Sequence, residues 1–398
     1  MQSIFSSPNP LLFGAGTSRL VGEKLKEFGC KKVLVVFDKG IKSSGVADRI
    51  INIIGGAGIE TVTYDGVQAD PPDWSVEEAG GIGVRERVDG VVGVGGGSSL
   101  DTAKGAKLLQ TNPPPINKYF GREGVVTKPS VPLIVIPTTA GTGSECTPGG
   151  VITDTKNNIK TNIAGVGCAV SLGIVDPELT LGLPPAVTAS TGMDALCHAV
   201  ESYTSNLSNS FCALTGKKAF ILVGKYLVRA FENGADLEAR EGMMLASSLG
   251  GISMSGPLCH LAHDIGKVLG GRFHVPHGNA CASCLPQVLE TIAPAVPEKV
   301  RDVTAALGGT VPEDAAPETL GRAARDTVRA LMTRLKLPAL RDYGAKNGFT
   351  KADLLEVVPP MVVTMQEGLV RLFGQGTSPV PATEALVASI VSRAWEEN

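Results

Sequence analysis

The segment ERVDGVVGVGGGSSLDTAKGAKLL (86–109) constrains the fold of this 398-residue chain more than any other. Val91, Val92 and Val94 are typical of the end of a buried strand, and the DTAKGAKLL run has the apolar spacing of a helix. The turn between them consists of Gly95, Gly96, Gly97, Ser98 and Ser99. Such a turn can hold a diphosphate, because glycines let a ligand approach the backbone and the N–H groups of a helix start attract anions. A strict G-x-G-x-x-G counted from Gly93 fails at Ser98, and a glycine-rich turn alone can be only a tight turn.

Strand-like and helix-like segments alternate through the first half of the chain. The expected strands are KKVLVVFD (31–38), GIETVTYDGV (58–67), VDGVVGVG (88–95) and VPLIVIPTTA (131–140). This alternation is typical of a largely parallel sheet covered by helices, and residues 151–168 alternate like a hairpin. Beyond Pro184 and Pro185, helical periodicity dominates. We therefore predict an α/β dinucleotide-binding domain over residues 1–184 and an all-helical metal-binding and substrate domain over residues 185–398.

Four side chains in the second half predict a metal site. Asp194 and His198 lie four residues apart in TGMDALCHAVE (191–201), so both can reach one ion from one helix face. His263 can project from a second helix, and His277 from the turn after it. Three imidazoles and one carboxylate suit Fe(II) or Zn(II) and leave a coordination position for a substrate. Taken singly, the Asp–His pair can be a surface hydrogen-bonded pair, and the later histidines can be buried and hydrogen-bonded.

Composition excludes several classes of partner. The net charge is −3 and no basic tract is present, so neither nucleic acid nor an anionic membrane is expected as a partner. No stretch approaches the roughly 20 apolar residues that span a bilayer. The start, MQSIFSSPNPLLFGAG, lacks a charged segment before an apolar one, so we expect no signal peptide and a cytoplasmic protein. The eight cysteines are scattered, as expected for reduced, buried thiols.

Together these motifs resemble the iron-containing (group III) alcohol dehydrogenase family. The matching segments are GGGSSLDTAK (95–104), IPTTAGTGSE (136–145), IVDPELTLGLPP (174–185), TGMDALCHAVE (191–201), and His263 with PHG (276–278). They occur in the family's order and cover most of residues 10–290. The resemblance implies a dehydroquinate synthase-like fold, with an α/β dinucleotide-binding domain followed by an all-α domain.

The resemblance also implies NAD as cofactor, with its diphosphate on the glycine-rich turn. Asp38, at the end of the first expected strand, corresponds to an acid near the adenosine ribose, where a carboxylate disfavours a 2′-phosphate. From the residues alone, Asp38 would be an ordinary strand-end turn residue, and Asp101 and Lys104 would only cap and solvate their helix. The implied cofactor-binding residues are Asp38, Gly95, Gly96, Gly97, Ser98, Ser99, Asp101, Thr138, Thr139, Thr142 and Leu179.

The implied activity is that of a metal-dependent, NAD(H)-linked alcohol dehydrogenase or aldehyde reductase. Hydride would pass directly between the nicotinamide and a substrate whose oxygen is bound to the metal, Fe(II) or Zn(II). The partners would be a small alcohol or aldehyde and further copies of the chain, in a homodimer or larger homo-oligomer. A metal-free enzyme like maleylacetate reductase and a lyase like dehydroquinate synthase stay open. Retention of all four ligands argues against the first, and Asp194 in place of a glutamate against the second.

One position departs from the family's pattern. The family has a second histidine four residues after the third ligand, and here that residue is Lys267. His260 and His274 are expected to be bystanders or pocket-edge groups. From the residues alone Lys267 is a solvated helix lysine, but it should share the face of His263. We therefore assign Lys267 and His277 as catalytic residues, and we expect the cation of Lys267 to favour aldehydes that carry a carboxylate.

Overall fold

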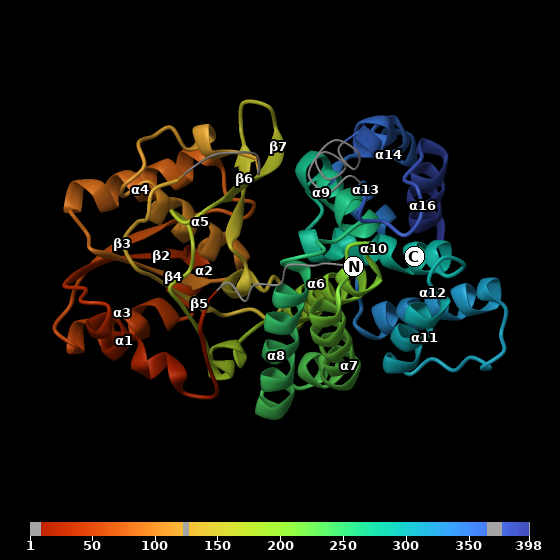
Figure 1. Ribbon diagram of the computed structural model, residues 1–398, viewed down its shortest axis with the longest axis horizontal. Helices are drawn as coiled ribbons and strands as arrows, with labels where there is room; N and C mark the ends of the chain where they lie inside the picture. The colour runs from red at the N-terminus through yellow and green to blue at the C-terminus, as the bar shows by residue number, and fades with distance from the viewer. Residues whose placement is uncertain (1–8, 122–126, 364–375, 398) are drawn as a thin grey trace. The chain divides into compact units, whose positions relative to one another are not determined.

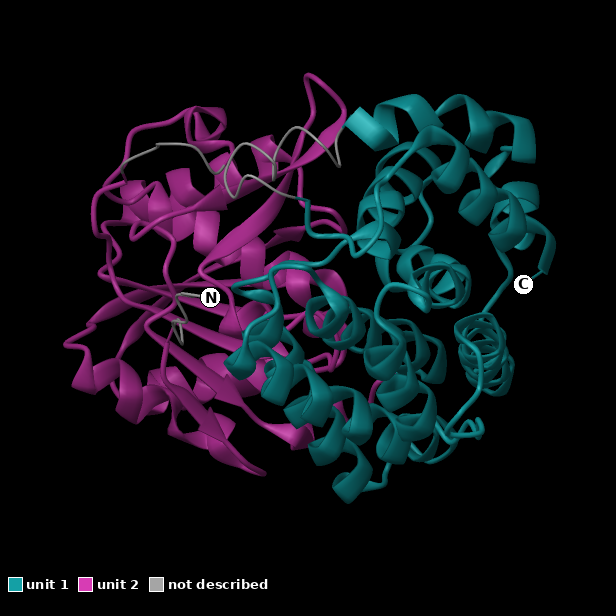
Figure 2. Ribbon diagram, turned by 45° about the vertical axis from the view of Figure 1, so that its right-hand side comes forward, with its two compact units in different colours: residues 1–6, 184–398 teal, residues 7–183 magenta. Residues whose placement is uncertain are grey.

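A computed structural model describes residues 9–121, 127–363 and 376–397 of the chain. The chain divides into two compact units and passes from one to the other between Leu183 and Pro184 (Figure 2). The first unit along the chain is magenta and keyed as unit 2 in that figure, and the second is teal and keyed as unit 1. Among the described helices, none combines the length and the apolar character that crossing a bilayer requires. Each unit is described separately below.

The first unit is built on a six-stranded parallel sheet in the order β1-β8-β5-β4-β2-β3 (Figure 1). The expected parallel sheet is thus confirmed, and two further strands, β1 and β8, extend it. An antiparallel pair, β6 and β7, lies where residues 151–168 predict a hairpin. The strands are β1 (Leu11–Phe13), β2 (Lys32–Asp38), β3 (Glu60–Val67), β4 (Gly90–Gly95), β5 (Leu133–Pro137), β6 (Gly149–Asp154), β7 (Ile159–Ala164) and β8 (Leu172–Val175).

Helices cover both faces of this sheet, which explains why its central strands are continuous apolar runs. Along β2, Val33, Val35 and Phe37 belong to the core under α1 and α3, whereas Leu34 and Val36 belong to the core under α4 and α5. Figure 1 shows these two helix pairs on opposite faces. The helices are α1 (Val21–Glu27), α2 (Lys39–Ser43), α3 (Val46–Gly56), α4 (Asp73–Glu86) and α5 (Gly97–Leu108), with short turns η1 (Thr17–Leu20), η2 (Ile116–Tyr119), η3 (Ser144–Cys146) and η4 (Pro177–Thr180).

The strand order places three candidate segments at one edge of the sheet. Strands β5, β4 and β2 are neighbours, all are parallel, and they end at Pro137, Gly95 and Asp38. Gly95 pairs directly with Pro137 in the register of β4 and β5. The chain also reverses its direction of travel across the sheet between β2 and β4, the kind of point where α/β sheets bind ligands.

The second unit is helical, and none of its described residues forms a strand, as the periodicity predicts. Helices α6 and α10 are its most buried elements: α6 packs against α7, α8 and α10, and α10 also against α9 and α12. Nearly every residue of these two helices from their second turn onward is therefore shielded from solvent. The helices are α6 (Pro185–Thr204), α7 (Ser210–Glu232), α8 (Leu237–Met254), α9 (Leu261–Phe273), α10 (His277–Ile292), α11 (Pro297–Ala306), α12 (Pro317–Arg334), α13 (Leu340–Asn347), α14 (Lys351–Glu356) and α16 (Glu384–Glu397).

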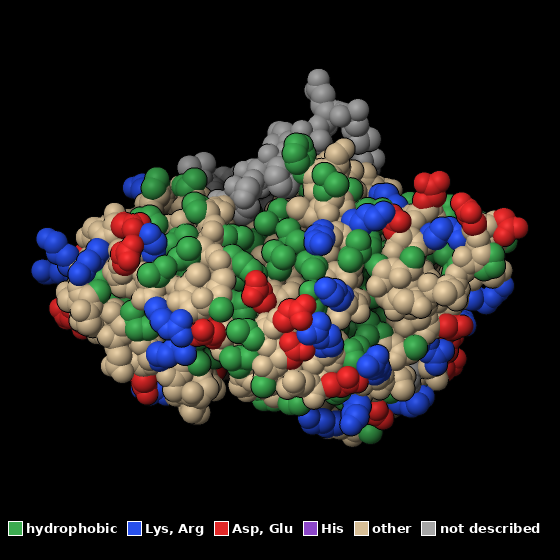
Figure 3. All heavy atoms as spheres, turned by 90° about the horizontal axis from the view of Figure 1, so that it is seen from below, with side chains coloured by type: hydrophobic (Ala, Val, Ile, Leu, Met, Phe, Trp, Pro, Cys, Tyr) green, Lys and Arg blue, Asp and Glu red, His purple; other side chains and the backbone are tan. Residues whose placement is uncertain are grey.

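Charges of both signs are mixed on the surface. The chain carries 36 Lys and Arg against 39 Asp and Glu. On the face shown in Figure 3, blue and red side chains are interspersed over the coloured part of the surface. Such a face offers no broad field of one sign that would attract a polyanion.

Candidate functional site

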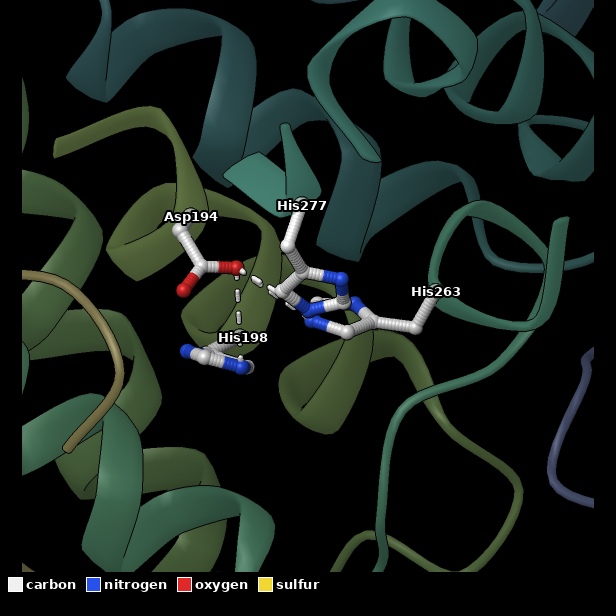
Figure 4. A group of neighbouring side chains, drawn as sticks. All are labelled: Asp194, His198, His263 and His277. Carbon is white, nitrogen blue, oxygen red and sulfur yellow. Dashed lines mark ion pairs between the residues drawn. The ribbon is translucent and has the colours of Figure 1, made fainter. Parts of the chain in front are cut away.

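Three helices of the second unit bring the four predicted metal ligands together. Asp194 and His198 extend from one face of α6, His263 from the first turn of α9, and His277 from the first residue of α10. Asp194 Oδ1 lies 3.8 Å from His198 Nε2, 3.6 Å from His263 Nε2 and 3.6 Å from His277 Nε2. Figure 4 shows the four side chains converging on one point. One ligand atom from each lies within 4.8 Å of the others.

These separations fit a shared ion better than direct hydrogen bonds. Two ligands about 2.1 Å from a tetrahedral ion lie roughly 3.4 Å apart, whereas a hydrogen bond of this type is about 2.9 Å long. Asp194 Oδ1 and His263 Nε2 are buried and have no hydrogen-bond partner among the described residues. Buried polar atoms are normally satisfied, so two orphaned acceptors aimed at one point fit a divalent cation.

The electrostatics of the site also favour a cation. Burial opposes the charge on Asp194, but His198, His277 and His263 hold the pKa of its carboxyl well below the ordinary range. Asp194 is therefore a carboxylate at neutral pH, as a metal ligand must be. His277 is the most open of the four, with 32% of its side chain exposed against 4% for Asp194. The centre is thus open on the His277 side and closed on the other.

The position of His277 differs from the expectation. We expected it in the turn after the second helix, but that turn ends at Pro276 and His277 is the first residue of α10. The following residue has to be small, because a Cβ atom at Gly278 would overlap the backbone oxygen of Ser190 on α6. Close contact between α10 and α6 therefore brings His277 next to Asp194.

Two buried side chains that motif reasoning did not assign to the site lie behind His263. Glu201 accepts hydrogen bonds from the backbone N–H groups of Ala262 and His263, at 2.7 and 3.1 Å, and from His263 Nδ1. His260 is completely buried, so it is not a pocket-edge group; its Nε2 bonds Thr204 Oγ1 at 2.9 Å. Burial alone would raise the pKa of Glu201, but His260 and His263 hold it at about 2. The signal for Glu201 was present in the sequence, three residues after His198, but its partners depend on tertiary packing.

Lys267 lies on α9 one turn beyond His263, as its spacing predicts. Its Nζ is 3.0 Å from Asp264 Oδ1, and 45% of its side chain is exposed. The lysine therefore already has an anionic neighbour in the protein. Its expected role toward a substrate stays a prediction.

The glycine-rich turn lies at the carboxyl edge of the sheet in the first unit. Gly95 has φ of 144°, and a Cβ atom there would lie 2.5 Å from Ser99 Oγ. At Gly97, the first residue of α5, a Cβ atom would lie 2.7 Å from Thr142 Cγ2. The backbone is thus bare where α5 begins, because neighbouring side chains exclude a Cβ atom at both glycines, and the free N–H groups of a bare helix start can bind a diphosphate.

The predicted threonines lie beside this turn. Thr139 is the nearest neighbour of a Cβ atom placed at Gly96, at 3.4 Å, and Thr142 flanks Gly97. Thr138 is buried, and its N–H donates to the carbonyl oxygen of Gly95 at 3.0 Å. Residues from three strand ends therefore meet at one edge.

Asp38 holds the start of α2 and also contacts α5. Its Oδ1 accepts from the N–H groups of Gly40 and Ile41, at 2.7 and 3.0 Å. Its Oδ2 accepts from Ser99 Oγ at 3.2 Å, which ties it to the glycine-rich turn. Asp38 is thus a helix cap beside the candidate diphosphate site.

From the residues alone we expected Asp101 and Lys104 only to cap and solvate their helix, and this expectation was wrong. Lys104 is completely buried, and its Nζ donates to Ser144 O, Ser144 Oγ, Thr147 Oγ1 and Gly149 O at 2.7–2.9 Å. Asp101 accepts from Ser144 Oγ at 2.7 Å and from the N–H of Val151 at 2.9 Å. The two residues join α5 to η3 and to the hairpin.

Leu179 lies in the hydrophobic core of the first unit. It sits in η4, 6% exposed, within the core cluster under α1 and α3. The turn is fixed by Asp176, whose buried carboxylate accepts from the N–H groups of Gly16, Ser18 and Glu178. A structural role for Leu179 is therefore evident, and its contact with a cofactor stays a prediction.

Comparisons with known proteins match both units. A family model described as iron-containing alcohol dehydrogenase matches residues 8–177, and one described as the C-terminal part of the Fe-containing alcohol dehydrogenase family matches residues 188–367. A choline dehydrogenase of Bacillus subtilis (strain 168) is 38% identical over 347 residues, which is 85% of each chain. A solved 1,3-propanediol oxidoreductase is 33% identical with a TM-score of 0.89, covering 99% of this chain and 100% of its own. A sulfoacetaldehyde reductase from Bifidobacterium kashiwanohense, solved with NAD+, is 28% identical with a TM-score of 0.86 over 100% of both chains.

Proposed function

The chain belongs to the iron-containing alcohol dehydrogenase family, and from this premise we propose that Asp194, His198, His263 and His277 hold one divalent ion at which an alcohol and its aldehyde are interconverted with NAD(H). We further propose Fe(II) as the resident ion, with Zn(II) as the alternative, since both accept imidazole and carboxylate ligands. Both directions of the reaction use the same residues.

One observation carries this proposal. Four ligand atoms from three helices lie within 4.8 Å of one another, and two of them are buried without a hydrogen-bond partner among residues 9–121, 127–363 and 376–397. A protein that needed only stability would gain by replacing such a cluster with apolar side chains. A cation that binds all four groups would offset the free-energy cost of burying this cluster.

The residues of the chain would hold the metal ion and the nicotinamide cofactor, and these two groups would supply the chemistry. When bound, the ion polarises the C–O bond of the substrate, and the nicotinamide carries the hydride. Asp194 contributes the charge that neutralises part of the ion, and the burial of His198 and His263 keeps water from that side. The exposed side of His277 leaves the approach for substrate.

The glycine-rich turn at the carboxyl edge of the sheet would bind the cofactor. The bare backbone at Gly95 and Gly97, where α5 begins, would hold the cofactor diphosphate, with Thr139 and Thr142 beside it. Asp38, held in place by Ser99, lies where the resemblance puts the adenosine ribose. We therefore propose NAD(H) rather than NADP(H) as the cofactor.

We also propose that the substrates include aldehydes bearing an anionic group. Lys267 provides a half-exposed cation one turn from His263. One relative is named a sulfoacetaldehyde reductase, and the substrate in that name combines an aldehyde with a negative charge. The contact between Lys267 and Asp264 weakens the expected preference for anionic aldehydes, because Asp264 already neutralises part of the lysine charge.

Metal content distinguishes one remaining alternative, and the net consumption of NADH distinguishes the other. A metal-free enzyme of the maleylacetate-reductase kind would turn over without any ion, and a lyase of the dehydroquinate-synthase kind would release no net NAD+ from NADH.

Assembly as a homodimer or larger homo-oligomer stays a prediction, and so does a cytoplasmic location.

The metal assignment is tested with His263→Ala. We expect the wild type to hold about one divalent ion per chain, and the variant to lose both the ion and aldehyde reduction. Metal content is measured by elemental analysis, and activity by NADH consumption. His274→Ala is the matched control, because His274 ends α9 and lies outside the ligand group. A His263→Ala protein with full metal content and turnover would refute the assignment.

A further inference from the structure

We propose that Glu201 is a positioning residue of the metal centre, whose carboxylate fixes the ring orientation and the tautomer of His263 so that Nε2 faces the ion. This inference rests on the proposed function, since it concerns one ligand of the same site. Glu201 is not itself within the four-residue ligand group.

The geometry of α6 places Glu201 in line with the ligands. Asp194, His198 and Glu201 follow the spacing i, i+4 and i+7, so all three lie on one face of the helix. Glu201 is completely buried. A buried carboxylate is costly unless it is paired, so its partners indicate what it is there to do.

Those partners are concentrated at the start of α9. His260 is the N-cap residue of this helix, and its side chain makes no capping hydrogen bond. Glu201 takes over that task from α6 by accepting from the N–H groups of Ala262 and His263. The carboxylate therefore also benefits from the helix dipole.

Capping does not account for the third hydrogen bond. Glu201 Oε2 also accepts from Nδ1 of the His263 ring. A carboxylate can only accept, so the proton must be on Nδ1, and in the neutral ring that a metal ligand requires the lone pair is then on Nε2. Nε2 is the atom that lies 3.6 Å from Asp194 Oδ1 and has no hydrogen-bond partner in the part of the chain that the structure describes. Metal-ligating histidines are commonly oriented by such a carboxylate on the other ring nitrogen.

A second imidazole holds the carboxylate from its other side. His260 Nδ1 lies 3.2 Å from Glu201 Oε1, an electrostatic contact rather than an aligned hydrogen bond. His260 is itself anchored through Nε2 to Thr204 Oγ1. Glu201 is thus fixed between two rings and one helix start, which leaves it little freedom to release His263.

The test compares Glu201→Gln with Asp176→Asn. Both remove the charge of a completely buried carboxylate that accepts backbone N–H groups, but Asp176 touches no imidazole. Zinc affinity is measured by competition with a chelator. We expect Glu201→Gln to bind zinc 10- to 100-fold more weakly and Asp176→Asn to bind it like the wild type. Equal zinc affinity of Glu201→Gln and wild type would overturn the positioning role while leaving the metal centre intact.

A measurement on the wild type decides the question even if the variant does not fold. The chain has only five histidines, so ¹⁵N-histidine labelling gives a tractable spectrum of the zinc-loaded protein. We expect His263 to coordinate through Nε2 and to keep a slowly exchanging proton on Nδ1. Coordination through Nδ1, or a rapidly exchanging Nδ1 proton, would overturn the proposal. A wild type that bound neither zinc nor Fe(II) would refute the metal centre itself, and this inference with it.

Discussion

At the scale of single residues, aspartates that lie in similar sequence motifs differ in their hydrogen-bond partners. Asp38, Asp101 and Asp194 each lie in a recognisable motif, yet only Asp194 has a buried oxygen without a partner. The other two carboxylates already accept N–H or O–H groups from neighbouring elements. Sequence motifs therefore identified candidate positions, and hydrogen-bond satisfaction separates an orphaned ligand from residues that also have structural roles.

Asp38 gives a prediction about cofactor choice. One carboxylate facing a 2′-phosphate costs on the order of a few kcal/mol, so we expect NADH to be preferred over NADPH by 10- to 1000-fold in kcat/KM. Asp38→Asn is the sharper test than Asp38→Gly, because asparagine keeps the cap on Gly40 and Ile41 and removes only the charge. Both variants should lose most of the discrimination. Equal use of NADH and NADPH by the wild type would mean that Asp38 does not face the ribose.

Lys267 gives a prediction about substrate charge. Because the side chain is 45% exposed and has Asp264 beside it, we expect an effect of about 1 kcal/mol, roughly fivefold, rather than that of a buried pair. Lys267→Met should lower kcat/KM for a semialdehyde by that factor and leave a neutral aldehyde of equal length unaffected. The matched pair of substrates is the internal control. A loss that is the same for both substrates would indicate a role in proton transfer instead.

At the scale of elements, the long apolar strands and the periodic helices could be predicted, and the short or interrupted elements could not. Strands β1 and β8 contain three and four residues, too few for alternation or an apolar run to stand out. Helix α10 begins at His277 although Gly278 follows at once and Pro286 lies inside it. Both residues argue against a helix locally, and burial against α6 and α9 overrides them.

Lys104 gives a prediction at the element scale, because it joins α5 to η3 and the hairpin. Lys104→Met would leave the buried oxygen atoms of Ser144 and Gly149 without their donor, at a cost of roughly 2–5 kcal/mol. Unfolding by urea measures this loss when tryptophan fluorescence is followed in a Trp395→Phe background, in which Trp74 on α4 is the remaining tryptophan. Lys26→Met, at an exposed site on α1, should change stability by less than about 0.5 kcal/mol. A Lys104→Met protein as stable as this control would contradict the role.

At the scale of the whole molecule, the sequence could locate both candidate sites but not their supporting residues. The four metal ligands and the glycine-rich turn follow from spacing and residue type. Glu201 and Lys104 could not be assigned, since each acts through partners about 40 to 60 residues away in the chain. Such long-range pairings arise only when the helices and the sheet pack.

We expect that one ion held by Asp194, His198, His263 and His277 is required for NADH-dependent aldehyde reduction. The most direct test is to strip the purified protein with a chelator and add Fe(II) anaerobically, or Zn(II), while recording turnover. The account predicts negligible activity without metal and a linear rise that ends at about one ion per chain. Full activity in the stripped protein, or activity that keeps rising well beyond one added ion per chain, would contradict this requirement.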